Sequence, residues 1–454
     1  MSDDQLSGAW PSQQLPSSWV WIPFDQFWSD FTDSQKKLPQ KSYRQAGRFA
    51  VVDQGEALIG GYTDDESLLS PAPLPAIVFG DHTRAVKFID VPFVQGADGV
   101  RVLGSPEGID PIFAFKALCA VNLPNKGYSR HFKFLKSTSF PLAPLEEQKR
   151  IVAKLDALNA KSARARTELA RIATLVSRYK QAMLGKAFSG ELTAGQISQL
   201  NTLSTPSFTV TRHPSHWRLM QLGDIADIKS GITLGKKRKP EDQLLELPYL
   251  RVANVQRGWL DLAEIKTIQV TAKEAEALFL RDGDVLMNEG GDRDKLGRGW
   301  VWDSQIADCI HQNHVFRVRL APKTVPPRFL SYYTNEFGQK HFFDEGKQTT
   351  NLASISKSKL SAMEVPIPPF EEAVEIVRRI ESAFARIDRL ASEAKRALEL
   401  VGKLDDAILA KAFRGELEPQ DENDEPAEKL LERIHAERAA IPKTKRGRGT
   451  LRAK

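Results

Sequence analysis

Polar loops that follow strand-like segments carry side chains able to bind phosphates and to hydrogen-bond with base edges. Residues 81–84 (Asp-His-Thr-Arg) directly follow one apolar run, and residues 128–131 form a second polar cluster. Farther along, lysine and arginine crowd residues 229–239 around glycines, and residues 288–298 mix Asn, Gly, Asp, Arg and Lys. Lys and Arg neutralise phosphates, whereas Arg and Asn can read bases in the major groove. The candidate DNA contacts are His82, Arg84, Tyr128, Arg130, His131, Lys236, Lys237, Arg238, Asn288, Arg293 and Lys295.

The overall charge does not support this interpretation by itself. The net charge is +6, but the tail after Pro442 supplies six Lys and Arg and no acid. Residues 1–140 carry 13 Lys and Arg against 15 Asp and Glu. Any basic surface must therefore be local, and a single charged loop could equally be a solvated one. Clusters in two separate regions make contact with DNA the better joint explanation.

A long repeat must position these loops. Residues 141–192 and 366–417 align without a gap at an offset of 225 residues. Each copy has acids just after a proline and ends in Lys-Ala-Phe, with a glycine two residues later. These are signals for the start and the end of a helix. Between them apolar residues alternate in steps of four and three, which is typical of a coiled-coil seam.

We therefore expect two long helices that pack against each other. About 40 helical residues at 1.5 Å each span ~60 Å, so the pair would act as a spacer. The seam residues do not choose between parallel and antiparallel packing. The residues expected to make spacer or partner contacts are Glu146, Glu147, Gln148, Leu155, Leu169, Phe188, Glu371, Glu372, Ile380, Leu390 and Phe413.

Two unlike heads precede the two helices, and each mixes short strands with short helices. Five segments result: a first head (1–140), a first helix (141–193), a linker with a second head (194–365), a second helix (366–418) and a C-terminal helix with a basic tail (419–454). The expected strands are 49–52, 76–79, 86–89, 132–135, 249–255, 284–288 and 314–320. The expected helices outside the repeat are 271–280, 327–335 and 427–440. The fold class is thus α+β.

The candidate catalytic and metal-binding motifs of this chain each lack a required residue or the required spacing. Residues 367–370 (Ile-Pro-Pro-Phe) lack the leading Asn or Asp of an amino-methylating motif, and residues 231–237 lack the spacing of a phosphate-binding loop. Cys309, His311 and His314 lie close together in sequence, but no Cys-x-x-Cys motif elsewhere in the chain would complete a zinc site. We expect neither catalysis nor a bound metal. Two cysteines and the lack of a long apolar run favour a cytoplasmic protein without a membrane span.

Several of these stretches together resemble a known family. Residues 141–148 (Pro-Leu-Ala-Pro-Leu-Glu-Glu-Gln) and 366–373 (Pro-Ile-Pro-Pro-Phe-Glu-Glu-Ala) are similar to the helix entry of type I restriction–modification specificity subunits, with Ala373 where Gln is usual. Residues 79–84, 250–254 and 282–286 are also similar to stretches of that family. The resemblance covers nearly the whole chain.

The resemblance implies an architecture and a set of partners. The heads would be two target recognition domains, separated by two long helices in an antiparallel intramolecular coiled coil. Each head would read one half of a split target in double-stranded DNA, and the helices would set the gap. Two methylating (M) subunits would dock on the chain as an adenine methyltransferase that uses S-adenosylmethionine, and restriction (R) subunits could join. This chain would be non-catalytic and hold no cofactor; the alternative is a coiled-coil scaffold that does not bind DNA.

Overall fold

The computed structural model describes most of the chain as two compact units. The described residues are 10, 14–96, 99–124, 127, 129–193, 200–203, 211–235, 243–291, 295–348 and 353–440. The first unit comprises residues 1–169 and 396–454, and the second comprises residues 170–395. Each unit contains one head and parts of both long helices. No described helix combines the length and the apolar character needed to cross a lipid bilayer.

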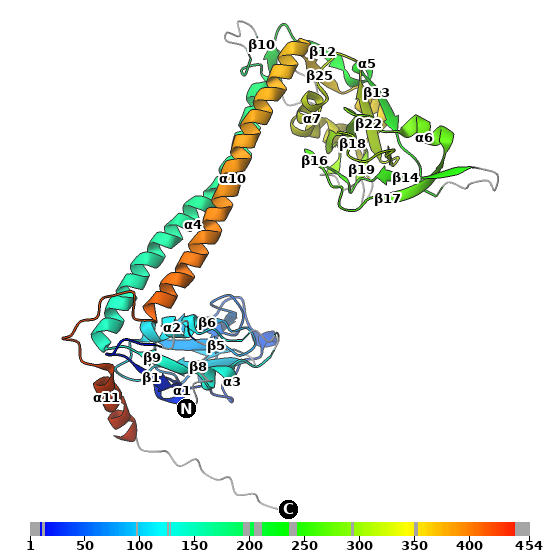
Figure 1. The fold of residues 1–454 in the computed structure, drawn as a ribbon. Helices are drawn as coiled ribbons and strands as arrows, with labels where there is room; N and C mark the ends of the chain where they lie inside the picture. Colours follow the sequence, from blue (N-terminus) through cyan, green and yellow to red (C-terminus); the bar gives the residue numbers. More distant parts are fainter. Residues whose placement is uncertain are drawn as a thin grey trace, which may run out of the picture. The chain divides into compact units, whose positions relative to one another are not determined.

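The first head is built on small sheets with helices packed against them (Figure 1). A four-stranded antiparallel sheet has the order β2 (Ser29–Asp30), β8 (Val100–Gly104), β5 (Ala76–Gly80), β6 (Val86–Ile89). A three-stranded sheet has the order β4 (Gly61–Thr63), β3 (Phe49–Val52), β7 (Phe93–Gln95), and β1 (Val20–Pro23) pairs with β9 (Ser139–Leu142). The helices are α1 (Phe24–Phe27), α2 (Pro111–Ala120) and α3 (Phe132–Lys136), with single turns at η2 (Gln40–Ser42) and η3 (Glu66–Leu68). Every residue of β5 is buried, so this strand forms the centre of the head.

Residues 132–135 form a helix, so the strand predicted there is wrong. The backbone N–H of Phe132 donates to the Asp81 carboxylate at 2.8 Å, which satisfies a donor at the helix N-terminus. Phe132 and Leu135 lie three residues apart and are both buried, as on one face of a helix. The apolar run predicted a strand because its partner, Asp81, is remote in sequence.

The second head also combines small sheets and helices. Its main sheet is antiparallel in the order β13 (Ala226–Ser230), β22 (Val315–Leu320), β18 (Val285–Asn288), β20 (Gly299–Val301). A mixed sheet has the order β17 (Lys266–Thr271), β14 (Leu244–Leu250), β21 (Ile310–His311), and β12 (Arg218–Gln221) pairs with β25 (Glu364–Ile367). The remaining strands are β10 (Leu200–Leu203), β11 (Thr211–Pro214), β15 (Val255–Gln256), β16 (Trp259–Leu260), β19 (Gly290–Gly291), β23 (Lys347–Gln348) and β24 (Ala353–Ser354). The helices are α5 (Leu222–Ile225), α6 (Ala272–Leu278), α7 (Pro327–Glu336), α8 (Gly338–Glu345) and α9 (Lys357–Ser361).

The strand predicted at 249–255 is interrupted. Strand β14 ends at Leu250, and a turn separates it from β15. Asn254 closes this turn: its side-chain oxygen accepts from the N–H of Arg251 at 2.9 Å, and its side-chain amide donates to the carbonyl of Asp261 at 2.8 Å. Asn commonly bonds to nearby backbone in this way and so ends a strand.

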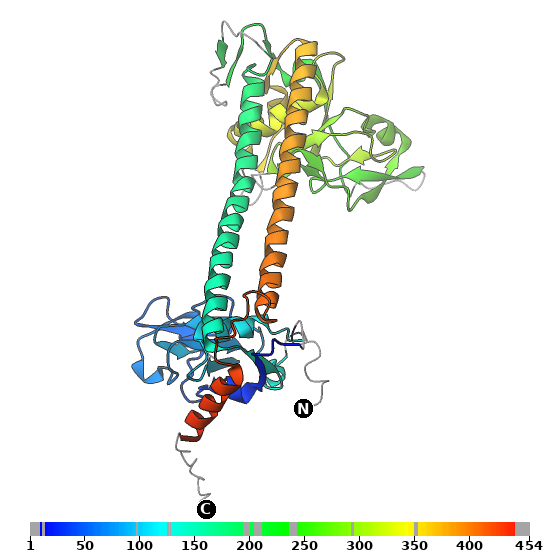
Figure 2. The ribbon, with the colours of Figure 1, turned by 60° about the vertical axis from the view of Figure 1, so that its left-hand side comes forward.

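The duplicated segments form the long helices α4 (Leu145–Phe188) and α10 (Phe370–Ala412). Within the first unit Arg166 pairs with Asp405 at 2.5 Å, and Lys154 pairs with Glu418 at 3.2 Å. Within the second unit Lys180 pairs with Asp388 at 2.6 Å. Partner numbers fall along α10 as they rise along α4, so the helices are antiparallel. Figures 1 and 2 both show α4 and α10 running alongside each other.

The seam between the helices largely follows the predicted alternation of four and three. Along α4 the buried or partly buried positions include 151, 155, 158, 162, 165, 169, 172 and 176, and along α10 they include 376, 380, 383, 387, 394, 397 and 401. The pattern shifts by one residue after 176 and after 387, where 180 and 391 are partly buried. Tyr179 and Leu390, where the regular alternation would continue, are 55% and 59% exposed.

Each long helix ends in the core of a head. In the second unit Phe188, at the end of α4, stacks edge-on against Phe329 and Tyr333 at 5.0 and 5.4 Å between ring centroids. In the first unit Phe413, just after α10, packs on Trp10 and Phe113 at 5.9 and 5.2 Å. The glycines two residues later, Gly190 and Gly415, have φ of +77° and +71°. Equivalent ends of the repeat therefore make equivalent contacts in two unlike heads.

The C-terminal helix belongs to the first head. Helix α11 (Ala427–Ala440) coincides with the predicted helix 427–440 and buries Leu430 and Ile434 in the first head's core. Gly108, with φ +87°, allows Leu430 to approach the backbone closely. Arg438 donates to the carbonyl of Asp25. The segment assigned to 419–454 thus contributes core residues to the head that begins the chain, a contact that sequence spacing did not predict.

Candidate nucleic-acid interface

The turn between β5 and β6 is anchored to the start of α3 in the first head. Asp81 is buried, and its carbonyl accepts from the backbone N–H of His131 at 2.8 Å. The Nδ1 of His131 lies 3.0 Å from the same carbonyl, a geometry in which Nδ1 carries the proton. Together with the Phe132 N–H on the Asp81 carboxylate, these bonds join two loops that lie 50 residues apart in sequence.

Two of the predicted DNA contacts meet at this junction. His82 and Arg130 line a pocket of about 130 Å³ together with Lys37, Asp81 and Arg101, and with the backbone of Gly99 and Val100. Arg130 is exposed and His82 is half-buried. Sequence reasoning missed Lys37 and Arg101, which lie outside any charge run. For Arg101 a signal did exist, because it is the one charged residue within the apolar strand β8.

Two other predicted contacts in the first head make hydrogen bonds within that head. His131 is 1% exposed and its Nδ1 donates to the carbonyl of Asp81, so its side chain does not face solvent. Arg84 is half-buried with φ of +62°, and its guanidinium donates to the carbonyl of Leu123 at 3.2 Å. Both residues therefore shape the loops that carry His82 and Arg130. Tyr128 lies outside the described residues.

In the second head, Asn288 is a further correction. It is 1% exposed, and its side-chain amide donates to the carbonyl of Val255 at 2.9 Å. Asn288 thereby ties the end of β18 to β15. Lys295 is described and half-buried, whereas Lys236, Lys237, Arg238 and Arg293 lie outside the described residues. Their role in DNA contact stays a prediction.

A buried polar network supports the main sheet of the second head. Arg319 on β22 makes two bonds of 2.7 Å to the carboxylate of Asp284, which is 1% exposed. Arg317, on the same strand, pairs with Asp227 on β13. The Nδ1 of His311 donates to the carbonyl of Val315 at 2.7 Å. Burial, partly opposed by this bond, lowers the pKa of His311 to about 4, so it is neutral near pH 7.

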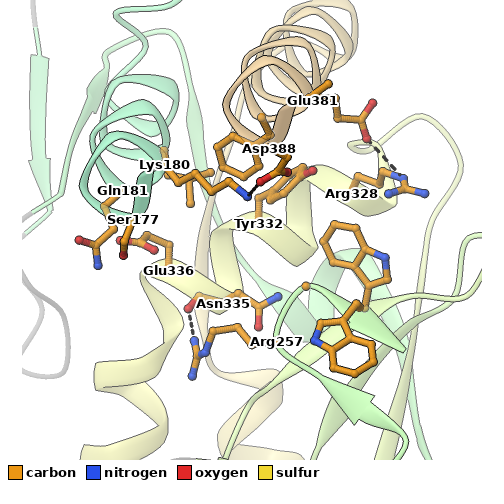
Figure 3. Close-up of a pocket in the computed structure, with 16 residues that line it drawn as sticks. Ser177, Lys180, Gln181, Arg257, Arg328, Tyr332, Asn335, Glu336, Glu381 and Asp388 are labelled. Atoms are coloured by element: carbon orange, nitrogen blue, oxygen red, sulfur yellow. Dashed lines mark hydrogen bonds and ion pairs between the residues drawn. The ribbon is translucent and has the colours of Figure 1, made fainter. Parts of the chain in front are cut away.

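A cavity of about 750 Å³ lies between both long helices and the second head, entirely within the second unit (Figure 3). We call it the aromatic bowl; its lining includes Lys180, Trp259, Trp300, Arg328, Tyr332, Glu381, Phe384 and Asp388. Tyr332 packs edge-on against Trp300 at 5.4 Å and Phe384 at 5.7 Å. Burial raises the pKa of Tyr332 to about 12. Part of the wall of the bowl is thus a set of aromatic rings in contact with one another.

Charged groups surround the aromatic bowl in pairs. The Arg328 guanidinium lies 5.1 Å above the Trp300 ring and bonds to Asp303 at 2.9 Å. Lys180 lies 5.0 Å from the Phe384 ring while it pairs with Asp388. Trp259 is 54% exposed at the edge. Trp, Tyr and Arg are the residues that most often carry binding energy at protein–protein interfaces. Sequence reasoning missed the bowl because its walls come from five separate segments.

The repeated segment at the start of each long helix contacts its own chain. Glu147 is buried and accepts from the Trp19 indole at 2.9 Å and from Gln420 at 2.6 Å. Its counterpart Glu372 accepts from Thr193 at 2.7 Å. Glu146 and Glu371 are exposed, whereas Leu155, Phe188, Ile380 and Phe413 are buried, and Leu169 is half-buried. Apart from Leu390, the apolar residues predicted for the spacer therefore lie at least partly in its contacts.

The difference between the two copies at Gln148 and Ala373 has a structural reason. Gln148 is fully buried, accepts from the N–H of Asp110 at 2.8 Å and donates to the carbonyl of Ala143 at 2.9 Å. Asp110 precedes helix α2, and the residue in the same place before α7 is Pro326. Proline has no N–H, so no acceptor is needed there and the small Ala373 fits.

Comparisons with known proteins agree with this architecture. The model of the type I restriction modification DNA specificity domain matches residues 214–400. The EcoKI specificity subunit of Escherichia coli K12 is 29% identical over 365 residues, which cover 72% of this chain and 76% of that protein. The EcoBI specificity subunit of Escherichia coli is 30% identical, over 67% of this chain and 66% of that protein. The crystal structure of the HsdS subunit from Thermoanaerobacter tengcongensis matches with a TM-score of 0.54 at 18% identity, over 90% of this chain and 99% of that one.

The family model covers the second head and most of α10, the EcoKI subunit aligns with 72% of this chain, and the structural match covers 90% of it. The chain belongs to the family of type I restriction–modification specificity subunits. Its α+β architecture, with two heads and an antiparallel helix pair, is the one expected from the sequence.

Proposed function

We propose that this chain reads a split target in double-stranded DNA, one half with each head, and that the helix pair sets the gap between the halves. One observation carries the proposal: α4 and α10 are duplicated and antiparallel, and each starts in the core of one head and ends in the core of the other. A duplicated spacer between unlike heads suits two readers of unlike sequences. Readers of the major groove on one face of a duplex must be about one turn, ~34 Å, apart or a multiple of it.

The two heads present different polar chemistry, which supports unlike half-sites. The first head gathers His82, Arg101 and Arg130 at one small pocket. The contacts predicted for the second head are Lys236, Lys237, Arg238, Asn288, Arg293 and Lys295, a different set of side chains, of which Asn288 and Lys295 are described. Because recognition of bases depends on the donors and acceptors in each loop, two unlike loop sets favour two unlike sequences.

Partner subunits supply the chemistry in this proposal. Two methylating subunits dock on the chain and transfer a methyl group from S-adenosylmethionine to adenine, and restriction subunits join that complex; the chain itself is non-catalytic. Large apolar side chains are exposed on the helix pair, which suits docking of partner helices. They are Leu175, Tyr179, Leu390, Leu398, Leu400 and Leu404. The aromatic bowl offers a further anchoring site with the composition of an interface.

Binding to duplex DNA in the presence of the methylating partner tests the proposal. The complex should prefer duplexes with both half-sites, lose part of its affinity when either half is scrambled, and bind more weakly as salt rises. A control duplex keeps both half-sites and changes only the bases in the gap; it should bind as well as the target. Absence of any sequence preference, with affinity independent of salt, would favour the scaffold alternative.

A further inference from the structure

We propose that the pocket at the β5–β6 turn of the first head binds an acceptor oxygen of DNA, and that Arg101 is the residue that selects it. The inference rests on the proposed function and names one contact within it. We call this hollow the first-head pocket; it is lined by Lys37, Asp81, His82, Gly99, Val100, Arg101 and Arg130. An acceptor oxygen can come from a phosphate or from the edge of a guanine, and both suit a guanidinium.

Arg101 is held in a fixed orientation. It lies on β8 directly opposite Phe79 of the central strand β5. Its guanidinium lies 4.6 Å from the centre of the Phe132 ring, and Phe132 is itself fixed by the bond of its N–H to Asp81. An aromatic face holds the plane of a guanidinium and leaves its N–H donors at the edge. Among the described residues no carboxylate forms an ion pair with Arg101, so these donors can serve a ligand.

The electrostatic balance of the first-head pocket favours an anion. Lys37, Arg101 and Arg130 contribute positive charge. Asp81 is the acid in the lining, and one of its carboxylate oxygens already accepts from the Phe132 N–H. Over residues 1–140 acids outnumber Lys and Arg by 15 to 13, so this concentration of positive charge is local. Such a hollow between low-dielectric walls attracts negative groups.

The size of the pocket limits what can enter. Its volume is about 130 Å³, roughly the share of four water molecules in the liquid, whereas drug-sized ligands occupy ~300 Å³ or more. One phosphate group or the edge of one base fits, and a complete nucleotide does not. Gly99, with φ +86°, keeps the wall open, because a Cβ there would come within 2.9 Å of the His82 ring.

The test uses the full chain in complex with its methylating partner and measures DNA affinity for Arg101→Ala and Arg101→Lys at several salt concentrations. Duplexes carry the full target, a scrambled first half-site or a scrambled second half-site. If the pocket holds a guanine edge, Arg101→Ala lowers affinity for the full target by about 5- to 150-fold. Scrambling the first half-site then has no further effect, whereas scrambling the second half-site still weakens binding. Arg101→Lys does not restore the affinity for the full target. If it holds a phosphate, Arg101→Ala weakens all duplexes alike, reduces the salt dependence by about one charge, and Arg101→Lys restores most of the affinity.

Two controls separate this inference from folding and from the proposed function. Arg48→Ala removes a comparable charge from the first head outside the pocket lining and should leave affinity unchanged. Arg130→Ala alters an exposed pocket residue without touching the core, and it should weaken binding in the same direction as Arg101→Ala. If Arg101→Ala and Arg130→Ala both bind DNA as Arg48→Ala does, the proposed role of the pocket is refuted. The proposed function would still hold in that case, provided that the wild type prefers duplexes with both half-sites. Loss of that preference in the wild type would instead refute the proposed function.

Discussion

At the scale of residues, buried polar groups hold the loops of both heads in place. His131 and Asn288 each bond to backbone that is distant in sequence, and His311 is buried within the second head. These groups contribute to stability through hydrogen bonds and do not face solvent. A buried donor left without its partner costs about 1–3 kcal/mol, which is why such residues tolerate little change.

His311 makes the stability of the second head depend on pH. Its pKa in the folded chain is about 4, below the 6.5 of an unperturbed histidine, so the unfolded chain binds the additional proton. Its contribution is therefore complete above pH 6.5 and is lost as pH falls toward 4. Compared with His311→Asn, which keeps a donor near the position of Nδ1, the wild type should lose on the order of 3 kcal/mol more stability over that range. Denaturant unfolding at several pH values measures this difference; parallel curves for the two proteins would contradict it.

The candidate contacts show how far single residues can be predicted. His82 and Arg130 were identified from their types in polar loops, and the structure brings them to one pocket. His131 and Asn288 have the same capacity for hydrogen bonds, and only their partners, 50 and 33 residues away, place them inside. Arg101 is the one charged residue of an apolar strand, which marks it as unusual but does not reveal the pocket that it lines. Local sequence thus indicates polar chemistry but not which side of the loop faces DNA.

At the scale of elements, α11 completes the first head. Leu430 is 2% exposed in that core and lies over Gly108. Replacing Leu430 by Ala should leave a cavity and cost about 2 to 5 kcal/mol of stability. Hydrogen exchange should report the loss in the first head, notably at residues 99–124, and leave the second head protected as in the wild type.

A matched leucine serves as the control for this prediction. Leu400 belongs to the same unit but is 62% exposed on α10, so Leu400→Ala should change stability by no more than about 0.5 kcal/mol. Equal effects of the two substitutions would show that α11 is not part of the core.

Elements with a strong period were predicted well, and short apolar runs were not. The long helices, α11, and strands such as β3 and β6 coincide with the sequence pattern. The run 132–135 became a helix because Asp81 caps it, and the run 249–255 was cut by Asn254. The predicted alternation of four and three along the helix pair is observed from 151 to 176 on α4 and shifts by one residue after that. A partner remote in sequence decides the run 132–135, whereas a local side chain decides the run 249–255.

At the scale of the whole molecule, the helix pair is proposed to set the gap between half-sites. Arg166 pairs with Asp405, which marks facing positions on α4 and α10. Inserting 21 residues, three heptads, at both positions keeps the alternation of four and three in register and lengthens the pair by ~32 Å, close to one turn of duplex. The preferred gap should grow by about 10 base pairs, with both half-site sequences unchanged. Insertion in α4 alone breaks the facing register and should destabilise the pair; an unchanged gap after the paired insertion would contradict the spacer role.

The most direct test of the central claim is to map the methylated adenines in DNA from cells that express this chain with its methylating partner. The account predicts one motif made of two short, unlike, fixed sequences separated by a gap of constant length in which any base occurs. A single uninterrupted motif, or methylation without a motif, would contradict it.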